Sequence, residues 1–265
     1  MLLIGVLCWV IELGRININT EDAILSQYSA QPCKGRLDSL YEIIAYMRKK
    51  LKSCIAFDPD EPDVNKDTFN DMAVLDDFYA NAEELLPPKM PKEWGKTMSM
   101  HFFVDSDNSR NKVTRRSHTG FLIYLQNAPI IWFSKRKNTV EISYFGSKFL
   151  AMRIAVERIK ALRYKLRMFW VPITSPANVF CGNQGVVKNT SIPDSTLLKK
   201  HKAVNYHSVC EAAACGIVCI GKEDIDTNLS DVLMKVLTKG QKDNLISYML
   251  YPHSVCILES HDKGE

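Results

Sequence analysis

The stretch HFFVDSDNSRNKVTRRSHTGFLIYLQNAPIIWFSKR, residues 101–136, decides the fold of this chain. It contains three runs that are rich in β-branched and aromatic residues, at 101–107, 119–125 and 128–136. Such runs predict strands, and the short polar turn at Gln126 predicts a hairpin between the second run and the third. We therefore expect the domain to begin with an antiparallel meander of three strands.

Helical and strand patterns alternate after this meander. Apolar residues at steps of three and four between Phe145 and Leu166 predict one long helix that packs against the sheet. The runs 177–183 and 217–223 predict two further strands, with a helix between them that Gly216 closes.

The end of the pattern predicts a short helix over 228–237 with Asn228 as its N-cap. The complete order is then βββαβαβα. Helical crossovers place the later strands parallel to their neighbours, so this order predicts an α/β fold. We expect a mixed five-stranded sheet flanked by helices.

The N-terminal part has a different character. Residues 1–12 carry one charge, lack the basic start of a signal peptide, and are too short for a membrane span, which takes about twenty apolar residues. They predict a core helix whose abrupt start suggests a missing upstream segment, and residues 38–52 predict an amphipathic helix. The acidic, proline-containing stretch that follows predicts a linker or a surface-hugging excursion. The expected organisation is a helical segment at 1–57, a linker at 58–99, the α/β domain at 100–240 and a tail at 241–265.

Composition limits the partners and the cellular compartment that we expect for this protein. The 265 residues include 34 basic and 30 acidic side chains, and this net charge of +4 permits contact with nucleic acid without requiring it. The eight cysteines form no C-x-x-C pair, and a chain of this size needs no disulfide staples. We expect an intracellular protein, in the cytoplasm or the nucleus, with neither a membrane nor a small-molecule substrate as partner.

Seven motifs follow one another over 104–237 and suggest a relationship. VDSD at 104–107 resembles a D-A-D motif, TRRSHTGFLIYL at 114–125 resembles R-R-S-x-T-G-[FY], and PIIWFSKRKNTVEIS at 129–143 resembles I-x-W-x-S-K-[KR]-Q-x-x-V-x-x-S. FGSKFLAMRIA at 145–155 is similar to a helix that carries a glutamate, and VFCGNQGVV at 179–187 to C-D-N-x-[SA]. KKHKAVNYHSVCE at 199–211 and NLSDVLMKVL at 228–237 resemble K-H-I-x-x-x-[YF]-H-x-[VI]-R-E and N-x-A-D-[LI]-F-T-K-x-L.

In this order the motifs resemble the C-terminal part of the Pol polyprotein of copia-type long-terminal-repeat retrotransposons, a group of transposable elements. That part comprises the end of reverse transcriptase and an RNase H-like domain. Residues 1–57 are similar to the end of reverse transcriptase and its connection, but the chain has no Y-x-D-D motif. The resemblance therefore excludes polymerisation by this chain alone.

The resemblance implies a ribonuclease H site that cleaves the RNA strand of an RNA–DNA hybrid. Two Mg²⁺ or Mn²⁺ ions would clamp the scissile phosphate in such a site, held by several carboxylates. The four carboxylate positions of the family fall on Asp105, Lys148, Gly182 and Asp231. Only Asp105 and Asp231 retain an acidic side chain and remain as metal and catalytic ligands.

Lys148 changes the electrostatics of this site. At about 4 Å and an effective dielectric constant of about 20, an ammonium group repels a divalent ion by roughly 8 kcal/mol. We expect the ammonium to replace the metal and to pair with Asp105 and Asp231. This predicts a pseudoenzyme that binds no metal tightly. Asp107 and Glu141 are alternative carboxylates. If the strand continues, Asp107 should point to the face opposite Asp105, and Glu141 precedes the long helix, so neither is a convincing substitute.

Several other residues have two open interpretations. His207 matches a histidine of the family that would assist product release or orient a carboxylate, and it is equally compatible with a structural histidine. Lys135 and Arg136 follow the third strand, and Arg153, Lys160 and Arg167 lie within about 40° of one another on the long helix. These five basic residues predict contacts with nucleic-acid phosphates, or else a solvated surface.

Three functional hypotheses remain open on the sequence. The first is a decayed Pol fragment that binds RNA–DNA hybrid or duplex nucleic acid weakly, with the ancestral reverse transcriptase domain as a further partner. The second is an active endonuclease that tolerates its altered ligands. The third is a domesticated interaction module that binds proteins.

Overall fold

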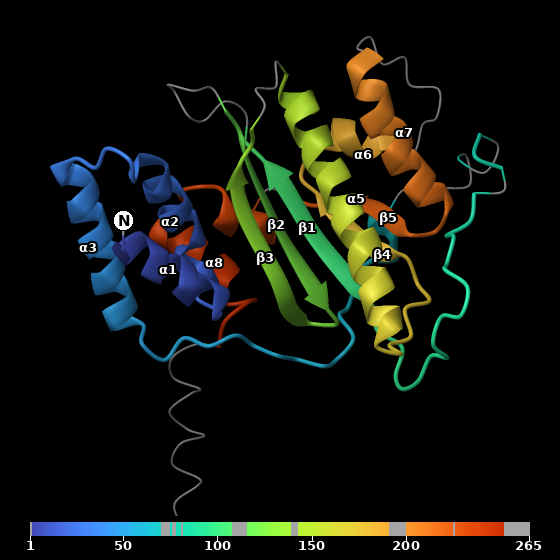
Figure 1. The fold of residues 1–265 in the computed structure, drawn as a ribbon, viewed down its shortest axis with the longest axis horizontal. Coiled ribbons are helices and arrows are strands. Elements are labelled where there is room, and N and C mark those ends of the chain that lie inside the picture. Colours follow the sequence, from blue (N-terminus) through green and yellow to red (C-terminus); the bar gives the residue numbers. More distant parts are fainter. Residues whose placement is uncertain are drawn as a thin grey trace, which may run out of the picture.

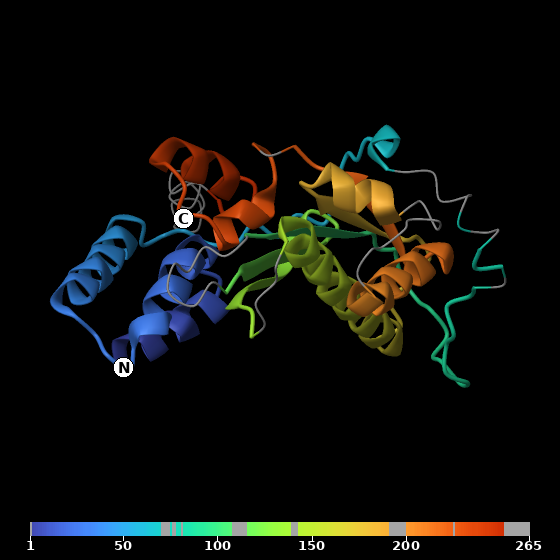
Figure 2. The same ribbon diagram turned by 90° about the horizontal axis from the view of Figure 1, so that it is seen from above.

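The computed structural model describes residues 2–69, 75, 78–80, 82–107, 116–138, 143–190, 200–224 and 226–251. Its centre is a sheet with helices on both faces, and a group of N-terminal helices lies at one side (Figure 1). Seen from above, the sheet separates the C-terminal helices from the long helix that follows the meander (Figure 2).

The sheet has five strands, namely β1 (Met100–Ser106), β2 (His118–Leu125), β3 (Ala128–Arg136), β4 (Ala177–Cys181) and β5 (Val218–Lys222). Their spatial order is β3-β2-β1-β4-β5. The first three strands pair antiparallel, while β4 pairs parallel with both β1 and β5. The predicted α/β fold with a mixed five-stranded sheet is confirmed.

Three helices follow the meander and the fourth strand: α5 (Tyr144–Met168), α6 (Gln184–Thr190) and α7 (Lys200–Ala214). The apolar stripe of α5, represented by Phe149 and Val156, is buried against Phe102 and Val104 of β1. The sequence pattern did not predict α6, although it carries a cap signal. The side chain of Asn183 accepts a hydrogen bond from the backbone of Val186 at 3.0 Å.

The opposite face of the sheet buries alternate residues of the same strands. Leu122 and Tyr124 point into a second core, which is covered by η4 (Leu229–Leu233) and α8 (Lys239–Ile246). The helix predicted at 228–237 is therefore a five-residue 3-10 helix, although Asn228 caps it as expected. The predicted boundary at residue 240 falls inside α8.

The N-terminal segment forms α1 (Leu2–Glu12), η1 (Ile16–Ile18), α2 (Asn19–Leu25), η2 (Ser26–Tyr28) and α3 (Lys34–Lys49). The prediction of a core helix is wrong for most of α1, because its buried residues are Leu7 and Ile11 while Trp9 is 64% exposed. No helix in the described ranges has the length and apolar character that a membrane crossing requires.

Two hydrogen bonds attach these N-terminal helices to the α/β domain. The indole of Trp132 in β3 donates to the carbonyl of Ile11 at 3.0 Å. The hydroxyl of Thr20 in α2 donates to the carbonyl of Val232 in η4 at 2.6 Å. The helical segment therefore packs on the β3 side of the sheet.

The segment 58–99, with η3 (Lys66–Thr68), follows the surface of the α/β domain where it is described. Phe69 forms a bridge with Gly221 of β5, and a Cβ at residue 221 would lie 2.9 Å from the Phe69 ring. Further along, the backbone amide of Met98 donates to the carbonyl of Pro172 at 3.0 Å. These contacts agree with the alternative in which this stretch runs along the surface of the domain.

Candidate active site

The four positions matched to family carboxylates converge at one end of the sheet. Asp105 lies near the end of β1, and the parallel register of Val104 with Cys181 places Gly182 beside it. Lys148 lies in the first turns of α5, and Asp231 lies in η4. The fold therefore brings together the positions that the sequence resemblance selected.

Gly120 positions the element that carries Asp231. This residue pairs with Asp105 across β1 and β2. A Cβ at residue 120 would lie 3.1 Å from the Leu233 Cβ and 3.2 Å from the Ser230 carbonyl. Because glycine lacks this atom, η4 can lie close against β2 and bring its aspartate to the end of β1.

Two lysines occupy the centre of the site. The Lys148 ammonium lies 2.5 Å from Oδ1 of Asp105, and the two side chains are only 5% and 3% exposed. The Lys235 ammonium lies 2.7 Å from Oδ2 of Asp231 and 3.7 Å from Oδ2 of Asp105. The predicted pairing of Lys148 with Asp105 is thus present. The predicted pairing with Asp231 is wrong, because Lys235 supplies that cation one helical turn after Asp231.

Burial shapes the ionisation of these groups. Burial by itself would lower the pKa of the Lys148 ammonium. The Asp105 carboxylate and the Tyr144 hydroxyl together raise this pKa by more than burial lowers it, so the net shift is upward. For Asp231, burial raises the pKa of the carboxyl group, and Lys235 offsets this only in part. Oδ1 of Asp231 is buried with no hydrogen-bond partner among the described residues.

The donor set does not fit a pair of divalent cations. A two-metal site needs several oxygen ligands around each ion, whereas Asp105 and Asp231 each face an ammonium group here. Within the described ranges, no three side chains of the His, Cys, Asp and Glu types gather in a way that suits a metal ion. A Cβ at Gly182 would nevertheless be tolerated, since it would meet its nearest neighbour, Nδ2 of Asn228, at 3.4 Å.

The alternative carboxylates and the histidine are placed elsewhere. Oδ1 of Asp107 accepts a hydrogen bond from the backbone of His118 at 2.6 Å, and Glu141 lies outside the described residues. Nδ1 of His207 lies 2.6 Å from the hydroxyl of Tyr79. Among the described contacts, the His207 ring therefore bonds to the segment 58–99 rather than to a carboxylate of the site.

Four of the five predicted phosphate contacts remain accessible. Lys135 is exposed and Arg136 half-buried. Both line a cleft of about 430 Å³ that β3 forms with α1 and α2. On α5, Arg153 pairs with Glu157 at 2.5 Å on the surface, and Lys160 is half-buried. The basic residues thus form two separate groups, on β3 and on α5.

Arg167 is a correction to the sequence prediction. Its guanidinium donates to both oxygens of Glu84 at 2.7 Å and to the carbonyl of Ile173 at 3.1 Å, and its side chain is 9% exposed. Arg163 donates to the same carboxylate and is 2% exposed. Helical periodicity placed Arg167 on the flank of α5, but the chain around Glu84 returns to cover that flank, so Arg167 cannot reach a phosphate.

The sequence analysis also missed Lys137. This buried ammonium donates to the carbonyl of Ser147 at 2.5 Å, to its hydroxyl at 2.9 Å and to the hydroxyl of Ser106 at 3.3 Å. It therefore ties the first turn of α5 to the end of β1, next to Lys148 and Asp105. One feature of the sequence could have pointed to this residue, because the motif matched at 129–143 has glutamine where this chain has Lys137.

No protein-family model matches the chain, but curated Pol polyproteins are similar to it. The Retrovirus-related Pol polyprotein from transposon RE1 of Arabidopsis thaliana is 25% identical over 153 residues, which is 58% of this chain. That from transposon RE2 of the same plant is 23% identical over 145 residues, or 55% of this chain. The chain spans about 10% of the length of either relative.

Two solved structures overlap with the model. The N-terminal RNase H domain of rv2228c from Mycobacterium tuberculosis, solved as a fusion with maltose binding protein, aligns over 57% of this chain and 98% of that chain, with 11% identity and a TM-score of 0.39. A foamy viral protease-reverse transcriptase in complex with RNA/DNA hybrid aligns over 80% of this chain and 27% of that chain, with 13% identity and a TM-score of 0.36. The sheet order, rather than these overlaps, defines the fold. Over more than half of its length, the chain is similar to the Pol polyproteins of copia-type retrotransposons.

Proposed function

We propose that this chain is an RNase H-like segment of a Pol polyprotein whose nuclease site has been converted into ion pairs, and that it binds RNA–DNA hybrid or duplex nucleic acid weakly without cleaving it. The similarity to retrotransposon Pol polyproteins and the order of the strands support the assignment as an RNase H-like domain. The loss of cleavage and the binding of nucleic acid are our proposals.

The ion pair between Lys148 and Asp105 carries the proposal. The ammonium lies 2.5 Å from the carboxylate that would be a metal ligand in the ancestral site. Because its pKa is raised, Lys148 keeps its positive charge at neutral pH. A divalent ion would have to displace this cation and would still lack the carboxylate that Gly182 does not provide. Lys235 is a different case, since the closing motif of the family also has lysine at that position.

A cleavage assay on a labelled RNA–DNA hybrid tests the proposal. The parent chain is compared with a Lys148→Glu, Gly182→Asp variant, in the presence of Mg²⁺ and, separately, of Mn²⁺. We expect no cleavage by the parent above the detection limit and a rate at least about 100-fold above that limit in the variant, because two added carboxylates complete a set of four with Asp105 and Asp231. The Cβ of the new side chain at residue 182 would lie 3.4 Å from Nδ2 of Asn228, which is an ordinary contact distance.

A matched control carries Lys165→Glu and Gly240→Asp. Lys165 and Gly240 are exposed, and a Cβ at residue 240 would have no neighbour within 4 Å. This control should remain inactive. Cleavage by the parent with either metal ion would refute the pseudoenzyme proposal and support the active-endonuclease alternative.

Binding is measured separately with the same hybrid. Phosphate contacts release counterions, so the affinity should fall as the salt concentration rises. Lys135→Glu together with Arg136→Glu should weaken binding, because these side chains are accessible at the end of β3. Hybrid binding that does not depend on salt would contradict the nucleic-acid part of the proposal.

A further inference from the structure

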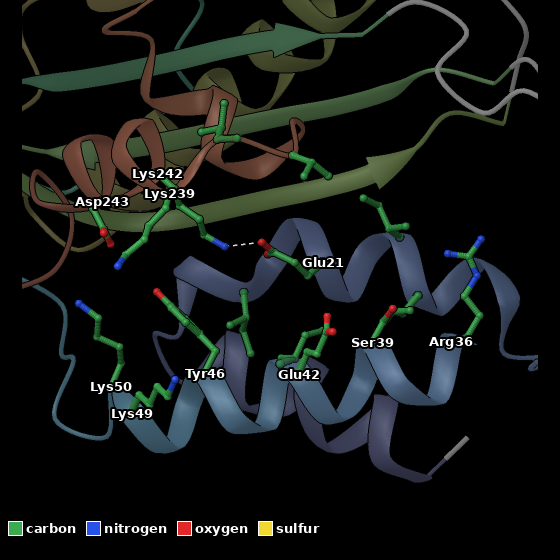
Figure 3. A pocket seen from close by; sticks show the side chains of 16 residues that line it. Glu21, Arg36, Ser39, Glu42, Tyr46, Lys49, Lys50, Lys239, Lys242 and Asp243 are labelled. Carbon is green, nitrogen blue, oxygen red and sulfur yellow. Dashed lines mark hydrogen bonds and ion pairs between the residues drawn. The ribbon is translucent and has the colours of Figure 1, made fainter. Parts of the chain in front are cut away.

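A second cleft, lined by other residues than the Asp105–Asp231 site, lies between the N-terminal helices and the C-terminal part of the chain. Helices α2 and α3 form one wall, and residues 236–243 at the start of α8 form the other (Figure 3). The cavity has a volume of about 700 Å³. It is therefore large enough for a nucleotide-sized ligand.

Positive charge dominates this cleft. Its basic residues are Arg36, Lys49, Lys50, Lys239 and Lys242, and its acidic residues are Glu21, Glu42 and Asp243. Lys242 is neutralised by an ion pair with Glu21. In the described ranges Lys49, Lys50 and Lys239 form no ion pair, and all three are exposed.

These three lysines share one end of the cleft. Lys50 and Lys239 reach from opposite walls toward this end, with Asp243 beside Lys239, and Lys49 follows on the same wall with its ammonium directed away from Lys50 (Figure 3). We call this end the lysine mouth, formed by Lys49, Lys50 and Lys239. Converging ammonium groups on two walls suit an anion that enters between them, because each adds to the same local potential.

An aromatic ring lies next to the lysine mouth. Tyr46 stands between the walls, and its hydroxyl accepts a hydrogen bond from Nδ2 of Asn17 at 3.0 Å. The Lys242 ammonium lies 5.4 Å from the centre of this ring. The side chains of Ile43 and Leu237 add apolar surface to the cleft. A fixed aromatic face beside a group of lysines offers stacking and phosphate binding together.

We propose that this cleft binds a short stretch of single-stranded nucleic acid, with phosphates at the lysine mouth and a base against Tyr46. This inference rests on the proposed function only in taking nucleic acid as the partner. The residues that line the cleft are separate from Lys135 and Arg136. The cleft geometry favours this ligand over a membrane, because a bilayer surface cannot enter between two walls. The combination of lysines with an aromatic ring favours it over an acidic peptide.

The experiment uses the full chain and a labelled single-stranded oligonucleotide of about twelve nucleotides. We expect Lys49→Glu, Lys50→Glu and Lys239→Glu together to weaken binding at least about tenfold. The slope of log K against log salt concentration should fall by about 2, since each lost phosphate contact contributes about 0.7 for a single strand. A Lys→Gln version of the same triple variant repeats the test if the charge reversal lowers the melting temperature.

Tyr46→Leu separates stacking from charge. It should weaken binding of the oligonucleotide about fivefold or more, because stacking of a base contributes about 1–3 kcal/mol. It should leave binding of inorganic tripolyphosphate unchanged, since that ligand has no base. Equal losses for both ligands would contradict the assignment of Tyr46.

The control variant Lys92→Glu, Lys96→Glu, Lys165→Glu makes the same charge change at three exposed lysines outside the cleft. It should bind the oligonucleotide within about twofold of the parent. Unchanged binding by the lysine-mouth variant would overturn the inference, and so would an equal loss in the control. Binding to phosphatidylserine vesicles through the lysine mouth, without oligonucleotide binding, would also overturn it. Loss of hybrid binding in Lys135→Glu, Arg136→Glu with retained single-strand binding separates this site from the one in the proposed function.

Discussion

The chain contains two buried groups of ion pairs that are built in opposite ways. In the Glu84 clamp, formed by Glu84, Arg163 and Arg167, both carboxylate oxygens accept hydrogen bonds from both guanidinium groups. Burial alone would raise the pKa of Glu84, but the two arginines lower it to about 2. In the Asp105–Asp231 site, the pKa of Asp231 is raised and one of its oxygens has no hydrogen-bond partner in the described part of the chain.

The difference shows what each group contributes. A guanidinium presents parallel donors that match both oxygens of a carboxylate, whereas an ammonium is a point charge on a flexible stem. The clamp therefore stabilises the fold, since it fixes the segment around Glu84 to α5. In the Asp105–Asp231 site, Lys235 compensates the burial of the Asp231 carboxylate only in part, so this group adds less to the stability of the fold than the clamp does.

Arg163→Ala should produce the largest effect on stability. It removes a side chain that is 2% exposed and leaves Glu84 with one arginine, so we expect a loss of about 3–5 kcal/mol in the free energy of unfolding. Urea denaturation followed by circular dichroism measures this loss. Arg158→Ala, at an exposed position on the same helix, is the control and should change stability by less than about 0.5 kcal/mol. A loss below 1 kcal/mol for Arg163→Ala would show that the clamp does not stabilise the fold.

Glu84→Gln tests the electrostatic part of the clamp through pH. The pKa of this carboxyl group is about 2 in the folded protein against the ordinary 4.5, so its stabilisation is present above 4.5 and is lost as the pH falls toward 2. We expect the variant to be less stable than the parent by about 2 kcal/mol near neutral pH. Unfolding curves of the two proteins should converge as the pH is lowered through this window. A difference that is independent of pH would mean that the carboxylate charge is not the cause.

Lys148→Met should produce the smallest effect of the three. Methionine keeps most of the volume of the lysine stem, and the ammonium of Lys235 lies 3.7 Å from the remaining Asp105 carboxylate and partly compensates it. We expect a loss of about 1–2 kcal/mol in the same urea experiment. If this loss equalled that of Arg163→Ala, the contrast between the clamp and the site would fail.

Local patterns predicted most of the fold and one of the three ion pairs of the site, the pair between Lys148 and Asp105. Alternation in 101–136 fixed the meander, because one face of each strand packs on α5 and the other on η4 and α8. Motif order located Asp105, Lys148, Gly182 and Asp231. The charge of Lys148 was then sufficient to predict its pairing with Asp105, since a buried ammonium needs a carboxylate.

The remaining features depend on contacts that are distant in sequence. Glu84 meets Arg167 across 83 residues, and no local pattern in 58–99 indicates that one glutamate there is nearly buried. The 3-10 helix around Asp231 arises because its backbone packs against Gly120, which periodicity alone does not reveal. Tertiary packing also exposed most of α1, although its composition suggested a core helix.

The two glycines near the Asp105–Asp231 site also bear on the evolutionary reversibility of the chain. A Cβ at residue 120 would lie only 3.1 Å from the Leu233 Cβ of η4, whereas a Cβ at residue 182 would meet its nearest neighbour at 3.4 Å. The changes that separate this chain from a four-carboxylate cluster thus lie in side chains, on a backbone that still holds all four positions together. A cluster of four carboxylates is therefore two substitutions away, at Lys148 and Gly182, and a side chain at residue 120 would disturb the element that carries Asp231.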